Sequence, residues 1–312
     1  MEYVADVTRS GLVESRHQGV VVCVGPAGEV EWSVSDPATI VFPRSSNKPF
    51  QIAALVREGL DLPSRLMALA TSSHSGEDFH LAGAREILAG AGLDESALQT
   101  PPDYPMGEEA RDAYIRAGGF PAPICMDCSG KHAAMLWVCV QRGWDTASYL
   151  APEHPLQRAI AATFVELTGA PIAVTGVDGC GAPLFATTLE AVTRGFGRLI
   201  QAAPGSAESR VVSAIVAHPE YVSGTTRDER ALLRAFPGAI AKFGAEAVYL
   251  VAMPDGRAIG VKIGDGGDRA RPVVMAAALT RAGYVHPVLD AVAVVLGGGQ
   301  PVGSVRATFP TG

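Results

Sequence analysis

The sequence predicts an α+β fold, in which one mixed sheet is built from the two terminal portions of the chain and is covered by helices. Strand-like segments concentrate near both ends, whereas helical patterns fill the middle, where a helical lobe is compatible with them. Hydrophobic residues make up 48% of the 312 residues and charged residues 18%, which is typical of a compact folded protein. No long linker rich in proline or serine divides the chain, so we expect a single domain over residues 1–312.

The strands are predicted from β-prone runs that flank tight turns. Residues 19–24 and 30–34 flank the turn "GPAG", and residues 247–252 and 258–263 flank "PDG", so each pair is expected to form a hairpin. A further apolar strand is expected at residues 291–296.

The helices are predicted from apolar residues that recur with a period of about 3.6 residues. Glycines at 92 and 143 follow two of these segments, where a helix commonly ends. The expected helices cover residues 50–58, 79–91, 132–141, 156–167, 210–217, 227–236 and 272–282.

Charge and hydropathy exclude several kinds of partner. The net charge of −7 comes without a basic run, so we expect no nucleic acid and no anionic lipid as a partner. The longest apolar runs span about seven residues, too few for a membrane helix, and the first residues lack the apolar segment of an export signal. We therefore expect a cytoplasmic protein. Its five cysteines, an odd number, do not suggest a disulfide framework.

The stretch "PRSSNKPFQ" places Ser45 and Lys48 three residues apart, so on a helix they share a face. A desolvated lysine amine can take the proton of such a serine. Pro49 is tolerated only in the first helical turn, so the helix should begin near Ser46, with Ser45 at the positive end of its dipole. The alternative is a serine-rich helix cap beside a solvated lysine.

Two further segments carry reactive side chains. In "ATSSHSGED", Ser73 and His74 precede the helix expected from residue 79, although Ser73 or Ser75 could simply cap that helix. In "TGVDGCGAP", glycines let the backbone bend around Asp178 and Cys180, which suits a loop near a ligand or a plain surface turn.

The segment "CMDCSGKH" looks like half of a zinc site, with two thiols at the CxxC spacing. No second CxxC follows and no histidine lies at finger spacing, so a zinc finger is not favoured. A redox-active pair, Cys125 with Cys128, is an open alternative.

Taken in order, several motifs resemble the bacterial L-asparaginase II family, the group like the inducible rhizobial enzyme. These motifs are "RSSNK", "SSHSGED", "CMDCSGKHAAML", "HPLQ", "TGVDGCGAP", "HPEYVSG" and "AFPGAIAKFGAEAVY". The resemblance implies a serine β-lactamase-like fold, an antiparallel sheet flanked by helices with a helical lobe. It also implies hydrolysis of L-asparagine to L-aspartate and ammonia by a homodimer.

The resemblance further implies two Ser-Lys tandems, Ser45 with Lys48 and Ser73 with Lys242. Ser45 is the expected nucleophile, although Ser73 has a comparable claim and the two lysines could exchange roles. The assignment of Lys242 to the second tandem rests on the flanking "GAEAVY" pattern, and another lysine, Lys262, lies not far downstream.

Four residues are expected to position the substrate, namely Arg44, His74, His132 and Asp178. The family's zinc ligands correspond to Cys128, Lys131 and Cys180, which leaves a fourth position for water, and Cys125 is then not a ligand. The alternative is that the thiols are merely buried small hydrophobic side chains.

Two rival functions stay open. One is another serine amidohydrolase of the β-lactamase or peptidase kind, although neither a clear S-D-N nor a K-T-G motif is present. The other is a zinc-containing binding protein that has no catalytic activity.

Overall fold

The computed structural model describes residues 1–290 and 293–311. Its main element is an antiparallel sheet with the strand order β10-β11-β1-β2-β9-β8-β7, in which β3 also pairs with β2. The pairing is antiparallel between all of these strands, so the mixed sheet is a wrong prediction and the antiparallel sheet implied by the resemblance is correct. The strands are β1 (Glu2–Arg9), β2 (Leu12–Val24), β3 (Val30–Val34), β7 (Ile240–Gly244), β8 (Val248–Ala252), β9 (Ala258–Ile263), β10 (Ala293–Gly297) and β11 (Gln300–Ala307).

The two predicted hairpins are confirmed. β2 pairs with β3 from Val21 opposite Val34, and β8 pairs with β9 across the "PDG" turn. β7, β8 and β9 are buried along almost their whole length, and the sequences of β8 and β9 are accordingly mostly apolar. Residues 291–292 of the last predicted strand lie outside the described residues, and the strand β10 follows them.

All seven predicted helices are present, with ends that differ by a few residues. They are α1 (Lys48–Arg57), α3 (Asp78–Gly90), α5 (Ser129–Arg142), α6 (Pro155–Thr168), α8 (Ala207–Ala217), α10 (Asp228–Ala235) and α11 (Arg271–Arg281). Four more helices were not predicted, namely α2 (Ser64–Ala70), α4 (Glu108–Arg116), α7 (Leu189–Ile200) and the short α9 (Pro219–Val222).

The helix α7 escaped prediction because of its glycines. Gly195 lies where an added Cβ would come within 2.9 Å of the Phe50 ring, and at Gly197 it would come within 3.2 Å of the carbonyl oxygen of Gly256. These glycines lower helix propensity but let α7 approach its neighbours closely.

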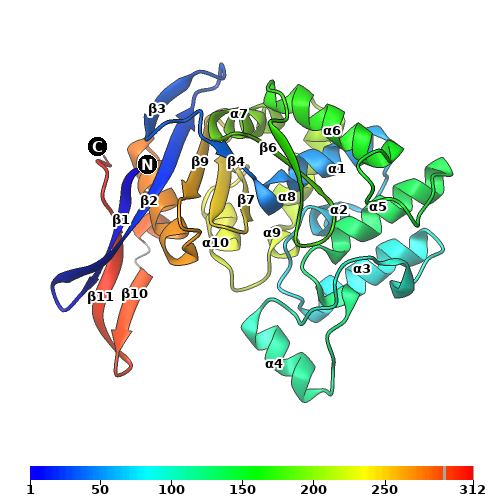
Figure 1. The fold of residues 1–312 in the computed structure, drawn as a ribbon, viewed down its shortest axis with the longest axis horizontal. Coiled ribbons are helices and arrows are strands. Elements are labelled where there is room, and N and C mark those ends of the chain that lie inside the picture. The colour runs from blue at the N-terminus through cyan, green and yellow to red at the C-terminus, as the bar shows by residue number, and fades with distance from the viewer. Residues whose placement is uncertain (291–292, 312) are drawn as a thin grey trace.

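The elements form a sheet layer and a helical lobe (Figure 1). The helices α7 and α11 pack on the sheet, while α1, α2, α3, α5, α6 and α8 pack on one another beside it. A small second sheet, β4 (Ile40–Val41), β6 (Pro183–Thr188) and β5 (Val174–Val177), links the two parts, and one hydrophobic core runs through both. The expected α+β fold, an antiparallel sheet with flanking helices and a helical lobe, is therefore confirmed. In the described part of the chain, none of the helices has the length and apolar content to cross a membrane.

Candidate active site

Ser45 lies on a short 3₁₀ turn, Arg44–Asn47, that leads directly into α1. The α-helix begins at Lys48 with Pro49 in its first turn, two residues after the predicted start. Arg44 has a φ of +51°, a left-handed conformation that a residue with a side chain rarely adopts and that recurs at functional sites. This bend leaves the Ser45 side chain half-buried at the wall of a cavity.

The cavity has a volume of about 400 Å³ and lies where the sheet meets the lobe. Its walls come from the turn that carries Ser45, from Ser73, from residues 126–128, from the turn between β5 and β6, and from the turn between β7 and β8. Met106, Arg227, Gly266 and Asp268 complete the wall. The cavity therefore brings together segments that are more than 200 residues apart in the sequence, and both serines of the predicted tandems line it.

Backbone contact between β7 and the Ser45 turn fixes one wall of the cavity. A Cβ atom added to Gly244 would lie 2.5 Å from the carbonyl oxygen of Pro43 and 3.1 Å from the backbone nitrogen of Ser45. Ser46 reinforces the contact, since its hydroxyl donates to the carbonyl oxygen of Lys242 at 2.8 Å. The position of Ser45 is thus set by a glycine on the edge strand of the sheet.

Lys48 contacts the second serine of the predicted site. Its Nζ atom donates to Ser73 Oγ at 3.0 Å and to the carbonyl oxygen of Ser72, and it lies 3.6 Å from Asp127 Oδ2. Burial disfavours the charged amine, but the neighbouring Cys128 sulfur and Asp127 carboxylate outweigh it and raise the pKa of Lys48. The structure therefore joins Ser73 to Lys48, whereas the sequence paired Lys48 with Ser45.

Lys242 lies behind the cavity wall in a fully buried ion pair. Its Nζ atom is 3.5 Å from Glu229 Oε1 and donates to the carbonyl oxygen of Phe243 at 3.0 Å. Burial lowers the pKa of Lys242 to about 8 and raises that of Glu229. The structure shows no hydrogen bond from Lys242 to Ser73, because the lysine side chain is directed to Glu229 instead.

Arg44 and Asp178, two of the predicted substrate-positioning residues, meet at the cavity. Arg44 Nε donates to Asp178 Oδ1 at 2.7 Å, and the same oxygen accepts from the backbone nitrogen of Gly179. Asp178 lies in the turn between β5 and β6, where Gly181 has a φ of +87°. The glycine-rich segment is thus a tight hairpin turn beside the cavity, as its composition suggested.

His74 and His132, which were predicted to position the substrate, do not line the cavity. Both are fully buried behind its wall, because their backbone segments direct them into the helical lobe. His74 Nε2 hydrogen-bonds Ser129 Oγ at 2.9 Å, and His132 Nδ1 hydrogen-bonds the Tyr149 hydroxyl at 2.7 Å. Burial lowers the pKa of His74 to about 3 and also lowers that of His132, which favours the neutral form of each ring.

The three predicted metal ligands lie close together, with Cys128 and Cys180 in the wall of the cavity and Lys131 fully buried beside Cys180. Lys131 Nζ lies 3.2 Å from Cys180 Sγ, and Cys128 packs against Cys180 in a small cluster separate from the main core. The hydrogen bond from Cys128, with the Lys131 ammonium and His132, lowers the pKa of Cys180 and favours its thiolate. The same hydrogen bond raises the pKa of Cys128.

This donor set fits a soft divalent ion such as zinc, which thiolates and nitrogen atoms bind well. His132 Nε2 is buried and has no hydrogen-bond partner among the described residues, and the neighbouring Cys180 raises the pKa of this ring against the effect of burial. Within the described ranges, no group of three His, Cys, Asp or Glu side chains could hold a metal, so a site here depends on the lysine. A metal would have to displace the Lys131 proton, as it does for thiols and water.

Two of the simpler interpretations do not hold. Cys125 packs in the main core rather than with Cys128, and all five cysteines are free thiols, so the structure gives no support to a redox pair. Ser75 donates to the carbonyl oxygen of Ser223, and Glu77 rather than a serine occupies the N-cap position of α3. Neither Ser73 nor Ser75 therefore caps α3.

Three residues of the site were missed from the sequence. Asp127 lies between Cys125 and Cys128, but no sequence pattern marks it as the partner of Lys48. Arg227 and Glu229 lie at a predicted helix start. Acidic residues such as Glu229 are common there because they interact favourably with the helix dipole, so neither residue was marked as part of a site. Only the tertiary fold brings them to Lys242 and to the cavity.

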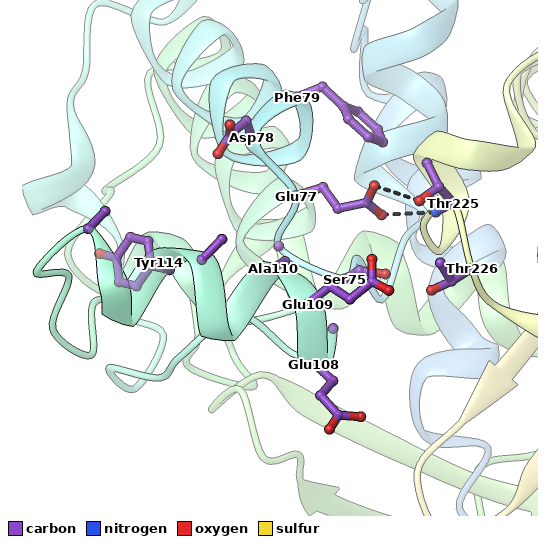
Figure 2. A pocket seen from close by; sticks show the side chains of 14 residues that line it. Ser75, Glu77, Asp78, Phe79, Glu108, Glu109, Ala110, Tyr114, Thr225 and Thr226 are labelled. Atoms are coloured by element: carbon purple, nitrogen blue, oxygen red, sulfur yellow. Dashed lines mark hydrogen bonds between the residues drawn. The ribbon is translucent and has the colours of Figure 1, made fainter.

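A larger cavity of about 560 Å³ lies between α4, the start of α3 and residues 225–226 (Figure 2). Glu77, Asp78, Glu108 and Glu109 make it acidic. Among the described residues that line it, there is no lysine, histidine or cysteine, so it offers no pair of the kind that activates a serine.

Comparison with known proteins identifies a family for this chain. The family model L-asparaginase II matches residues 5–307. No curated protein shows a significant match.

Among solved structures, a β-lactamase from Mycobacterium bovis is 18% identical, with 85% of this chain and 95% of that chain covered and a TM-score of 0.46. The hydrolase EstCE1, with promiscuous acyltransferase activity, is 13% identical, with 84% and 93% covered and a TM-score of 0.44. A glutaminase from Bacillus is 11% identical, with 79% and 83% covered and a TM-score of 0.35.

These likenesses are distant, and no conclusion about fold or activity is drawn from them. The family match, by contrast, spans nearly the whole chain and includes every residue of the cavity wall. The chain belongs to the L-asparaginase II family and is accordingly an enzyme, an L-asparagine amidohydrolase.

Proposed function

We propose that the chain hydrolyses L-asparagine through a covalent acyl-enzyme, with Ser45 as the nucleophile. The observation that carries this proposal is the convergence of Ser45 and Ser73 on one cavity, with the Lys48 amine on Ser73 Oγ at 3.0 Å. Ser45 is the more exposed of the two serines and begins the segment that leads into α1, where the helix dipole favours a developing negative charge.

The proposed reaction then runs in two steps, acylation of Ser45 and hydrolysis of the acyl-enzyme. Ser45 Oγ forms a bond to the side-chain carbonyl carbon of asparagine, its proton passes to a lysine amine, and the C–N bond breaks as ammonia leaves with a proton returned by that amine. Water next attacks the acyl carbon, the Ser45 ester bond breaks, and L-aspartate leaves while the serine regains its proton. Ser73, in contact with Lys48, is placed to carry protons between these groups.

The two lysines differ in pKa, which decides how readily each one is available as a neutral base. Lys48 lies beside Asp127, and its raised pKa keeps it charged. Lys242, whose pKa is lowered to about 8, gives up its proton closer to neutral pH. We assign the role of holding Ser73 to Lys48, because the two side chains are in contact. We propose Lys242 as the proton acceptor for Ser45, a role in which its amine must turn from Glu229 and the Phe243 carbonyl toward the adjoining Ser45 turn. This assignment exchanges the lysines of the two expected tandems.

The oxyanion of each tetrahedral intermediate needs donors that are fixed in advance. The backbone N–H of Ser45 is such a donor, because the close contact with Gly244 fixes its position. Arg44 and Asp178, joined by their ion pair, form the part of the wall assigned to substrate positioning. His74 and His132 act from behind the wall, by holding Ser129 and Tyr149.

We also propose that Cys128, Lys131 and Cys180 hold a zinc ion. The support is the convergence of these three buried side chains and the tendency of Cys180 to be a thiolate. When bound, the ion would supply a positive charge that polarises and orients polar groups of the substrate. The residues of this chain would carry the proton transfers themselves.

Two properties carried by the family resemblance complete the proposal. The enzyme is proposed to act as a homodimer and in the cytoplasm, on a small-molecule substrate. Light scattering on the purified protein tests the dimer, and cell fractionation tests the location.

The experiment that tests the function is ammonia release from L-asparagine, measured beside L-glutamine and a β-lactam, with and without added zinc. The proposal expects turnover of L-asparagine and its loss in the Ser73→Ala variant with an unchanged circular dichroism spectrum. Turnover of the β-lactam instead would favour the rival amidohydrolase. Zinc binding without turnover of any amide would favour the binding protein.

A further inference from the structure

Among the described residues, two charged side chains in the wall of the candidate active-site cavity take part in no ion pair, the exposed Glu246 and the cation Arg227. Arg44 is bound to Asp178, Lys48 lies beside Asp127, and Asp268 accepts from Arg271 at 2.7 Å. Arg227 has no carboxylate within 4.0 Å among the residues that the structure describes, although it lines the same cavity. Within the described part of the chain, its side chain donates a single hydrogen bond, to the sulfur of Met106 at 3.0 Å.

A thioether is a weak acceptor, so this contact leaves most of the five guanidinium donors of Arg227 without a strong partner. Removing a charged group from water into a half-buried wall is costly unless an opposite charge offsets it. A half-buried arginine that faces a cavity and has no carboxylate partner is complementary to an anion that enters the cavity.

The guanidinium of Arg227 is also held in place. It lies 4.3 Å from the centre of the Phe243 ring, on β7, which leaves the edges of the planar fork free for hydrogen bonds. The preceding loop is tied to α3, because Glu77 accepts from the backbone nitrogen and the hydroxyl of Thr225 at 2.9 and 2.8 Å (Figure 2). A fixed planar fork suits a carboxylate, which it can bind through two parallel hydrogen bonds.

We propose that Arg227 binds the α-carboxylate of the amino-acid substrate and so selects amides that carry this group. The proposal rests on the proposed function, since Ser45 is taken to attack the amide at the other end of the same molecule. It gives the enzyme a way to reject simple amides, which would leave Arg227 unpaired in a filled cavity.

The test compares two amides, L-asparagine and 3-aminopropanamide, which is the same molecule without its α-carboxylate. In the Arg227→Met variant, kcat/KM for L-asparagine is expected to fall about 30-fold or more, mainly through KM, because a desolvated charge pair is lost. The rate with 3-aminopropanamide should change less than about threefold, since that substrate never makes the contact. The preference for L-asparagine therefore collapses.

Arg234→Met is the matched control, because Arg234 is exposed and pairs with Glu220 outside the cavity. It should keep the preference of the unaltered enzyme. An equal fall for both amides in Arg227→Met would show a purely structural role and overturn the proposal, as would an unchanged preference.

Calorimetric binding of the product separates this inference from the proposed function. L-Aspartate should bind the unaltered chain and bind Arg227→Met at least about 30-fold more weakly, whereas β-alanine, which lacks the α-carboxylate, should bind both weakly. If L-asparagine is not hydrolysed but aspartate binding depends on Arg227, the catalytic proposal fails and the inference stands. If aspartate binds both proteins equally, the inference fails whatever the turnover.

Discussion

Replacement of Gly244 by alanine tests whether the edge strand β7 sets the position of the nucleophile. The new Cβ atom would lie 2.5 Å from the carbonyl oxygen of Pro43, about half an ångström closer than the 3.0 Å below which real Cβ contacts are essentially absent. The obstacle is backbone rather than a side chain that can rotate, and the nitrogen of Ser45 lies at 3.1 Å. The turn that carries Ser45 must therefore move away from the strand.

The structure sets the expected size of the effect. Overpacking of this kind costs about 1 to 3 kcal/mol of stability. Since a misplacement of about 1 Å at a catalytic group can cost a factor of about 10², a shift of half that size should lower kcat about 10-fold. The assay is ammonia release from L-asparagine, together with thermal unfolding of the same sample.

Gly90→Ala provides the control. Gly90 lies in α3, where an added Cβ would make only ordinary contact with Trp137, at 3.6 Å, so the change should stabilise the protein by about 0.5 to 1 kcal/mol and leave kcat unaltered. If Gly244→Ala retains full kcat, the Ser45 turn does not depend on β7 and the reasoning is refuted.

Two other predictions concern charge and metal. Glu229 raises the pKa of Lys242 against the effect of burial, so Glu229→Gln should lower that pKa from about 8 and move the alkaline rise of kcat/KM to lower pH; an unchanged profile would remove Lys242 from the role of base. The purified enzyme should contain one zinc ion per chain by metal analysis, and Cys180→Ala should abolish this content while the far-ultraviolet circular dichroism stays native. Zinc retained by Cys180→Ala would refute the ligand set.

Much of the fold could be predicted because its signals are local. The hairpin that joins β2 to β3 follows from two apolar runs and a Pro/Gly turn, and α1 follows from its periodicity and Pro49. The strand β11 could not be predicted, because Pro301 and Gly303 weaken its pattern. It forms only because β1, almost 300 residues away, pairs with it.

β7 was missed for a related reason, because Lys242 interrupts its apolar pattern in a fully buried strand. The charge is tolerated there only because Glu229, on α10, pairs with it. A partner that lies on another element leaves no trace in the local pattern of the strand.

The candidate site shows the same division between local and tertiary signals. Ser45 and Lys48 are recognisable from a spacing of three residues, but the hydroxyl that Lys48 contacts belongs to Ser73, 25 residues further on. His74 and His132 stand beside reactive residues in the sequence, yet the backbone directs both into the lobe. Sequence neighbourhood indicated which segments form the site, and the fold determined which side chains face the cavity.

The central claim, an acyl-enzyme on Ser45, is tested most directly by the partition of that intermediate between water and hydroxylamine. L-Asparagine and the β-methyl ester of L-aspartate would form the same acyl-enzyme, so the account predicts the same ratio of L-aspartate β-hydroxamate to L-aspartate from both substrates, and neither product from Ser45→Ala. Ratios that differ between the two substrates, or a Ser45→Ala variant that still forms both products, would contradict it.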